Sequence, residues 1–133
     1  MIKIIFATAT LAGYFVPGVG NAAPITLLCT GSLSYPDQTP VKISAETAVL
    51  DLEAGTFKPP IYPRFKIISL SDTSISFAND TSTVSLTGSL DRISGSLEFT
   101  AMPMSERDKI GKGGSIKMTA WMTAKCVPAS RMF

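Results

Sequence analysis

Apolar and polar residues alternate with a period of two along much of this chain. The last segment shows the pattern most clearly, with one side formed by Ile116, Met118, Ala120, Met122, Ala124 and Cys126. Successive side chains of a β-strand point to opposite faces, so this alternation predicts a strand over residues 116–126 with one buried face. One wet face and one buried face are typical of an antiparallel sheet.

The same alternation recurs upstream and predicts further short strands. They cover residues 25–33, 41–52, 65–70, 75–77, 84–90 and 96–101. The phase slips inside the second of these, which indicates a bulge or break near Glu46 and Thr47. Three prolines in residues 59–63 indicate an extended connection. Helical periodicity is scarce, and residues 105–110 could form one helical turn with Ser105 as its N-cap.

Seven or eight short strands separated by regular turn signals predict an all-β fold. The two candidate architectures are an antiparallel sandwich and a small up-and-down barrel. Both remain open from the residues alone.

A local pattern, Leu-Asp-x-x-x-Gly followed by Ser or Thr and an apolar residue, occurs at residues 50–57 and again at 90–97. An aspartate can accept hydrogen bonds from the backbone amides of its own turn. A glycine four residues later can adopt positive φ and close a hairpin. We therefore expect two hairpin turns, in which Asp51, Gly55, Asp91 and Gly95 have structural roles.

The beginning of the chain has the features of an export signal. Lys3 is the only charge before an apolar stretch over residues 4–16, which has the length of a signal-peptide core. Cleavage after Ala22 fits the small residues there. The expected organisation is a signal peptide at 1–22 and one β domain at 23–133, exported to the periplasm or secreted.

The two cysteines, Cys29 and Cys126, lie on the apolar sides of the first and last predicted strands. Export leads to an oxidising compartment, where two cysteines are expected to pair. The bridge would close a loop of 97 residue steps. A loop of that length is worth about 4–5 kcal/mol in the chain-entropy model. We expect a disulfide that joins the terminal strands.

Charge and composition exclude several function classes. The formal charge is +2, or +1 without Lys3, and this gives no strong field for nucleic acid or anionic membranes. No second stretch predicts a transmembrane segment in the mature chain. Histidine is absent, which removes Ser-His-Asp and Cys-His catalysis and histidine metal sites. We expect neither a cofactor nor a metal.

Paired carboxylates remain the one route to catalysis, because two of them can hydrolyse glycosides without histidine. Asp51 with Glu53, and Asp91 with Glu98, are the possible pairs. Each residue falls in a predicted turn or on a solvent face, so we expect a protein that is not an enzyme.

Trp121 stands out because it lies on the polar face of the final strand, between Thr119 and Thr123. Either a loop or the tail covers it, or it marks a binding surface with Tyr62 and Phe133 as neighbours. Both interpretations are open at this stage.

Two resemblances follow from the motifs. Leu-x-Cys-x-Gly at residues 27–31, Leu-Asp-Arg-x-Ser-Gly at 90–95 and a closing strand that ends at Cys126 resemble small exported bacterial β proteins with one disulfide and no assigned activity. The chain is also similar, more loosely, to the periplasmic inhibitors of C-type lysozyme, small disulfide-linked barrels with a Ser-Gly-x-x-Tyr loop. Here Ser94-Gly95-Ser96-Leu97 is followed by Glu98, and Phe99 comes one place late.

The expected function is an exported, non-enzymatic binding or interaction module of the cell envelope. Its partner would be an unknown protein or a small apolar ligand. The alternatives are a lysozyme-type inhibitor, which the second resemblance implies, and a carboxylate-dependent hydrolase.

Overall fold

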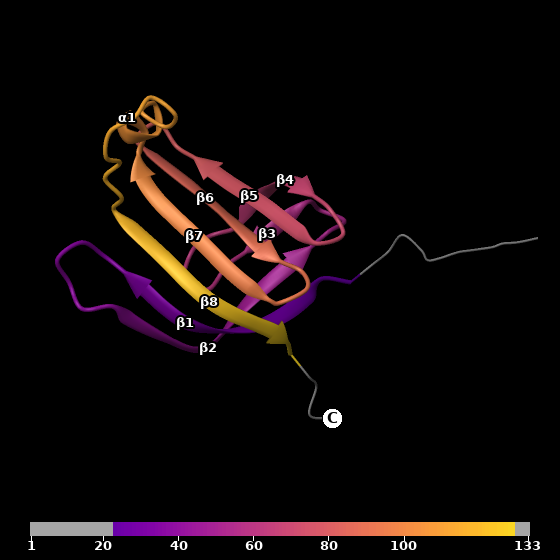
Figure 1. Ribbon diagram of the computed structural model, residues 1–133. Coiled ribbons are helices and arrows are strands. Elements are labelled where there is room, and N and C mark those ends of the chain that lie inside the picture. The colour runs from indigo at the N-terminus through magenta and orange to yellow at the C-terminus, as the bar shows by residue number, and fades with distance from the viewer. Residues whose placement is uncertain (1–22, 130–133) are drawn as a thin grey trace, which may run out of the picture.

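A computed structural model describes residues 23–129, which form a closed antiparallel barrel of eight strands (Figure 1). The strands are β1 (Ile25–Ser34), β2 (Val41–Asp51), β3 (Thr56–Lys58), β4 (Phe65–Leu70), β5 (Ser74–Asp80), β6 (Val84–Asp91), β7 (Ser96–Pro103) and β8 (Ala120–Pro128). Their order around the barrel follows the chain, and β1 closes the barrel against β8. Of the two predicted architectures, the up-and-down barrel is therefore confirmed. The proposed signal peptide at 1–22 and Phe133 lie outside the described residues.

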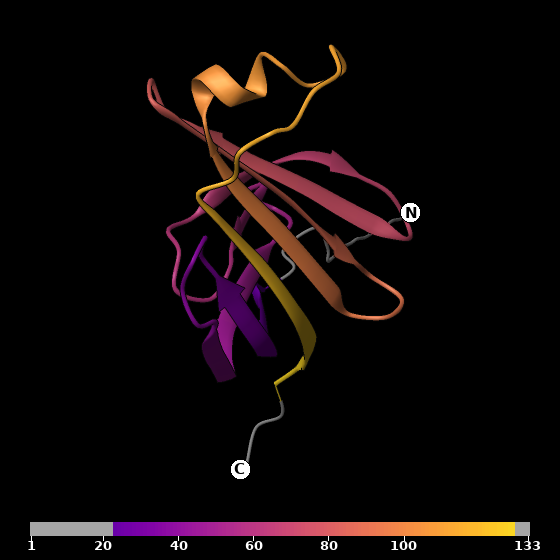
Figure 2. The same cartoon turned by 60° about the vertical axis from the view of Figure 1, so that its left-hand side comes forward.

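The two ends of the barrel differ. One end, here called the hairpin end, carries the β2–β3, β4–β5 and β6–β7 turns together with the start of β1 and the end of β8. The other end, the α1 end, carries the short helix α1 (Met104–Arg107). Figure 2 shows α1 and the segment after it raised above this end of the barrel. The helical structure within residues 23–129 is too short and too polar to cross a membrane.

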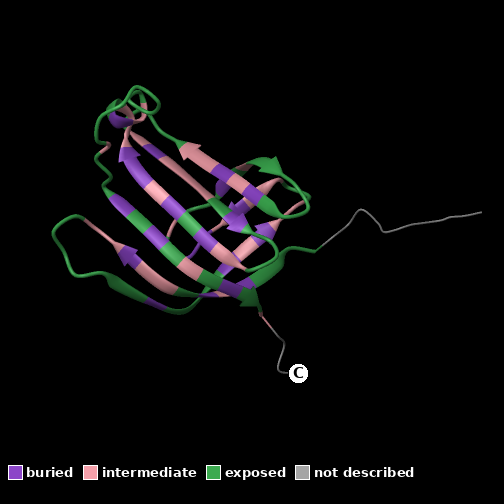
Figure 3. Cartoon of the chain, viewed as in Figure 1, coloured by how far each residue is buried: buried purple, intermediate pink, exposed green. Residues whose placement is uncertain are grey.

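Aromatic side chains fill the barrel interior. Buried and exposed residues alternate along the strands (Figure 3), as the sequence pattern predicts. The rings of Phe57 and Phe77 lie 4.8 Å apart between centroids, and Phe65 lies 5.4 Å from Phe77 and 5.2 Å from Phe99. All four rings are fully buried. An eight-stranded barrel is just wide enough for such side chains to fill it, so this interior is a packed core.

The predicted disulfide is present and lies in that core. Cys29 on β1 is directly opposite Cys126 on β8, and both are buried. Eight residue pairs join these two strands, from Leu27–Pro128 to Ser34–Trp121. The bridge therefore ties together the strands whose pairing closes the barrel.

Two local expectations are wrong. The last strand begins at Ala120 rather than at residue 116, because the backbone N–H of Lys117 donates to the side chain of Glu106 at 2.9 Å and the chain turns away from the sheet there. The helical turn is present, but its N-cap is Pro103 and no side chain caps it, so Ser105 does not have the predicted role.

The expected irregularity in β2 is confirmed, close to its predicted position. The β1–β2 register shifts between Cys29 and Gly31, and Ala45 on the opposite strand has a φ of 51°. An extra residue in one strand reverses the inward and outward positions beyond it. This explains why the apolar phase of β2 changes.

Candidate functional site

The two predicted hairpin turns use their aspartates in the same way. In the β2–β3 turn, the N–H of Ala54 donates to Asp51 Oδ1 at 2.9 Å. In the β6–β7 turn, the N–H groups of Ile93 and Ser94 donate to Asp91 Oδ1 at 2.8 and 2.9 Å. These bonds, from Ser94 first and then Ile93, hold the pKa of Asp91 below its usual range.

Both turns also use glycine at positive φ, 71° at Gly55 and 80° at Gly95. The aspartates and glycines therefore build the hairpins. Their carboxylates accept hydrogen bonds from turn amides, as expected of residues with structural roles.

The carboxylates of the two predicted pairs lie at turns or on the outer face of the barrel wall. Asp51 and Glu53 belong to the β2–β3 turn, and Glu98 lies on the exposed face of β7 opposite Thr123, several positions from the turn that holds Asp91. Within residues 23–129, no group of three or more histidine, cysteine, aspartate or glutamate residues could hold a metal ion.

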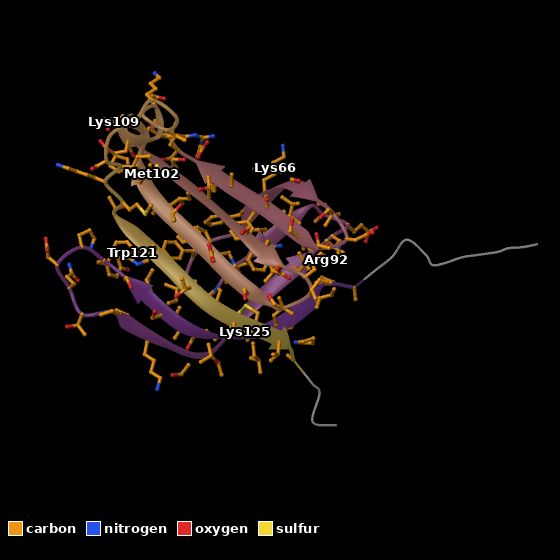
Figure 4. All side chains as sticks on the ribbon, viewed as in Figure 1. Lys66, Arg92, Met102, Lys109, Trp121 and Lys125 are labelled. Carbon is orange, nitrogen blue, oxygen red and sulfur yellow. A yellow bond between two sulfur atoms is a disulfide. The ribbon has the colours of Figure 1, made fainter. Side chains whose placement is uncertain are left out.

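Trp121 lies on the outer face of the barrel wall. It is 38% exposed and is paired with Thr100 on β7 and with Ser34 on β1. Figure 4 shows it near the start of β8, toward the α1 end, whereas Arg92 and Lys125 lie toward the hairpin end. Neither a loop nor the tail therefore covers Trp121 completely, and part of its side chain is open to solvent.

Trp121 borders a groove of about 690 Å³, here called the Trp121 groove. Three parts of the chain line it: the β7–β8 wall, the β1–β2 loop and the strap, which is the connection from α1 to β8 at residues 108–119. The lining residues are Pro36, Glu98, Phe99, Thr100, Ile116, Lys117, Met118, Trp121, Met122 and Thr123.

The chemistry of the Trp121 groove is mainly apolar. Ile116, Met118 and Trp121 provide large apolar side chains, while Glu98 and Lys117 provide one charge of each sign. Pockets of this volume, with an apolar lining and a few polar groups, accommodate small organic ligands. Methionine is flexible and polarisable, so it adapts to ligands of different shape.

Tyr62, the expected neighbour of Trp121, does not line this groove. It lies in the β3–β4 connection, and its ring packs on the buried ring of Phe99 with centroids 4.6 Å apart. Burial, followed by the adjacent Tyr35 hydroxyl, raises the pKa of Tyr62. Tyr62 therefore contributes to the packed side of the wall, and Trp121 belongs to the outer side.

A second, smaller hollow of about 310 Å³ lies at the hairpin end. Leu27, Leu50, Leu90 and Cys126 form its apolar part, and the β6–β7 turn borders it. Sequence reasoning did not find this hollow, because its lining residues come from β1, β2, β6, β8 and the β6–β7 turn, which only the folded barrel brings together.

Sequence reasoning misassigned the end of the strap, since the predicted last strand began at residue 116 and left residues 102–115 outside every strand. Ile116 and Met118 continue the alternation of β8, and the sequence alone therefore assigned them to a buried strand face. The signal that could have separated them is the run of glycines just before, at Gly111, Gly113 and Gly114. A glycine-rich stretch marks a connection rather than the start of a paired strand.

Comparisons with protein-family models, curated proteins and solved structures find no match to this chain.

Proposed function

We propose that this chain is an exported, non-enzymatic binding module that takes small apolar ligands in the Trp121 groove. The observation that carries the proposal is an apolar hollow of about 690 Å³ on the outer wall, beside a half-exposed tryptophan. The barrel interior is packed with phenylalanine rings and offers no comparable room there. Ligand binding is therefore assigned to the outer wall.

Two further features support the proposal. The chain has no histidine, and the carboxylates of Asp51 and Asp91 accept hydrogen bonds from turn amides. The buried Cys29–Cys126 bridge fits an oxidising compartment, such as the periplasm or the exterior of the cell.

The chain provides its own reporter for a test, because Trp121 is its only tryptophan. Titration with the neutral apolar dye Nile red should raise the emission of the dye and quench that of Trp121. We expect Met118→Asp to weaken dye binding by about tenfold or more, since it places a charge in an apolar wall.

The matched control is Ile68→Asp. Ile68 is 62% exposed on β4 and lines neither hollow, so its substitution introduces the same charge elsewhere. Dye binding that survives Met118→Asp, or that both variants lose equally, would contradict the proposed site.

Lysozyme-type inhibition through the β6–β7 hairpin is the second candidate. One observation favours it: Ile93 at the tip of that hairpin is 78% exposed, beside the Ser94-Gly95 pair of the motif. The position that holds tyrosine in the inhibitors holds Glu98 here, and Phe99 is buried. A C-type lysozyme assay with the purified domain tests this candidate, with Ile93→Asp expected to abolish any inhibition.

A further inference from the structure

The strap forms one wall of the Trp121 groove, although it is not part of the sheet. Ile116, Lys117 and Met118 face the groove from the strap. The strap ends where Thr119 joins the barrel, through its N–H and the carbonyl oxygen of Ala101 at 2.8 Å. The position of this wall therefore depends on what holds residues 116–118.

Glu106 holds them. Its Oε1 accepts the N–H of Lys117 at 2.9 Å, and its Oε2 accepts Lys109 Nζ at 2.8 Å. Glu106 is only 8% exposed, and among residues 23–129 it is the one charged residue that is buried. A hydrogen bond to a charged group is stronger than one between neutral groups, so this contact is the firm attachment of the wall.

Glu106 itself stands on a fixed support. Its neighbour Arg107 forms an ion pair with Asp80 at the end of β5 and donates to Ser85 on β6 at 3.2 Å. The N–H of Met104 donates to the carbonyl of Thr83 at 2.9 Å. The helix is therefore anchored to the barrel independently of the strap.

The strap has the residues that allow it to move. Gly111, Gly113 and Gly114 have φ values of 82°, 81° and 88°, and apart from the glycine itself and its two chain neighbours no residue comes within 4 Å of where a Cβ would stand. Glycines in open space can absorb the backbone changes of a hinge.

We propose that the strap is a movable wall that opens and closes the Trp121 groove, with Glu106 as its latch. The inference rests on the proposed function for its purpose, but the movement itself can be measured without a ligand. Opening breaks the bond from the Lys117 N–H to Glu106 and moves Ile116 and Met118 away from Trp121.

Acid should release the latch. The groups that face Glu106 are Lys109 and Lys117, while Arg107 beside it is paired with Asp80. Two hydrogen bonds hold the pKa of Glu106 below its usual range: first the one from the Lys109 side chain, and then the one from the Lys117 N–H. The latch is therefore complete above the ordinary range of a glutamate and is lost as the pH falls through the lowered pKa.

Limited trypsin digestion of the unliganded protein tests the latch, because Lys112 and Lys117 lie in the strap. Under native conditions the cleavage rate follows the fraction of open strap. We expect Glu106→Ala to raise the cleavage rate at these lysines by about tenfold, and the milder Glu106→Gln to raise it less. Glu53→Ala, in the β2–β3 turn at the opposite end, is the control and should leave the rate unchanged.

Equal strap cleavage in the Glu106 and Glu53 variants would overturn the latch, even if Nile red binds in the groove. Faster cleavage in the Glu106 variants, with an unchanged urea midpoint for global unfolding, supports it. If Nile red then failed to quench Trp121, the ligand proposal alone would fall. The two failures are thus distinguishable.

Discussion

The surroundings of Gly95 restrict which residue can occupy that position. It has the positive φ that closes the β6–β7 hairpin, and its carbonyl accepts the N–H of Cys126 at 2.8 Å. A Cβ at this position would lie 2.2 Å from the carbonyl oxygen of Cys126. Gly55 occupies the same place in the β2–β3 hairpin with similar φ, but nothing lies within 4 Å of its missing side chain.

These two glycines give a matched pair of substitutions. Gly55→Ala should cost about 1 kcal/mol, the penalty of a left-handed backbone for a residue with a side chain. Gly95→Ala adds a clash with the backbone of β8, so we expect a loss at least about twice as large. Urea unfolding of both variants measures the difference, and equal losses would show that the contact with Cys126 is not restrictive.

Asp91 should make stability depend on pH. Its pKa is lowered in the folded protein, so the stability it contributes is present above the ordinary pKa of aspartate and is lost as the pH falls through the lowered value. Asp91→Asn should therefore reduce the loss of stability on acidification. Urea midpoints at neutral and acidic pH measure this, with the exposed Asp72→Asn as control, and parallel acid profiles for both variants and the parent would refute it.

At the scale of elements, the alternation of side chains predicted most strands, and the disulfide joined the pair expected. The alternation failed at Ile116 and Met118, because a period of two records only which side chains are apolar. It does not record whether the backbone has a partner strand. The Lys117 N–H donates instead to the side chain of Glu106, eleven residues earlier. The local alternation of apolar and polar residues cannot predict such a contact.

The candidate site was predictable only in part for the same reason. Trp121 was identifiable as an apolar residue on a polar face. Its groove needed the strap and Pro36 from the β1–β2 loop, which only the closed barrel brings beside β8. Tyr62 was an attractive neighbour by residue type, but the β3–β4 connection directs it onto Phe99.

The disulfide is the element-scale feature with the largest expected effect on stability. Cys29→Ala combined with Cys126→Ala opens a loop of 97 residue steps. We expect a loss of about 4–5 kcal/mol from the chain-entropy model, a large part of the total for a domain of this size. Urea unfolding of the double variant measures it, compared with Ala101→Ser, which alters another buried position without affecting the bridge. A double variant as stable as the parent would show that strand pairing alone holds the terminal strands.

At the scale of the whole molecule, the barrel wall is uneven. β3 has three residue pairs with β2 and two with β4, whereas β1 and β8 share eight. A short strand has few hydrogen bonds to lose when it opens. β3 is therefore the weak part of the wall, and β2 separates it from the disulfide-linked strand β1.

Hydrogen exchange should reveal this unevenness. Because local opening precedes exchange, the amides of β3 should exchange faster than the paired amides of β1 and β8 by about tenfold or more. Native-state exchange followed residue by residue by NMR measures the pattern. Uniform protection around the barrel would show that it opens only as a whole.

The position of the Cys29–Cys126 bridge also decides how the domain responds to pulling. Tension that enters before Cys29 and leaves after Cys126 passes directly through the sulfur atoms, so the 97 residue steps between them carry no load. Strands that would otherwise peel apart one after another are shielded. If the domain is linked to larger structures at both flanks, it would act as an inextensible joint whose groove keeps its shape under strain.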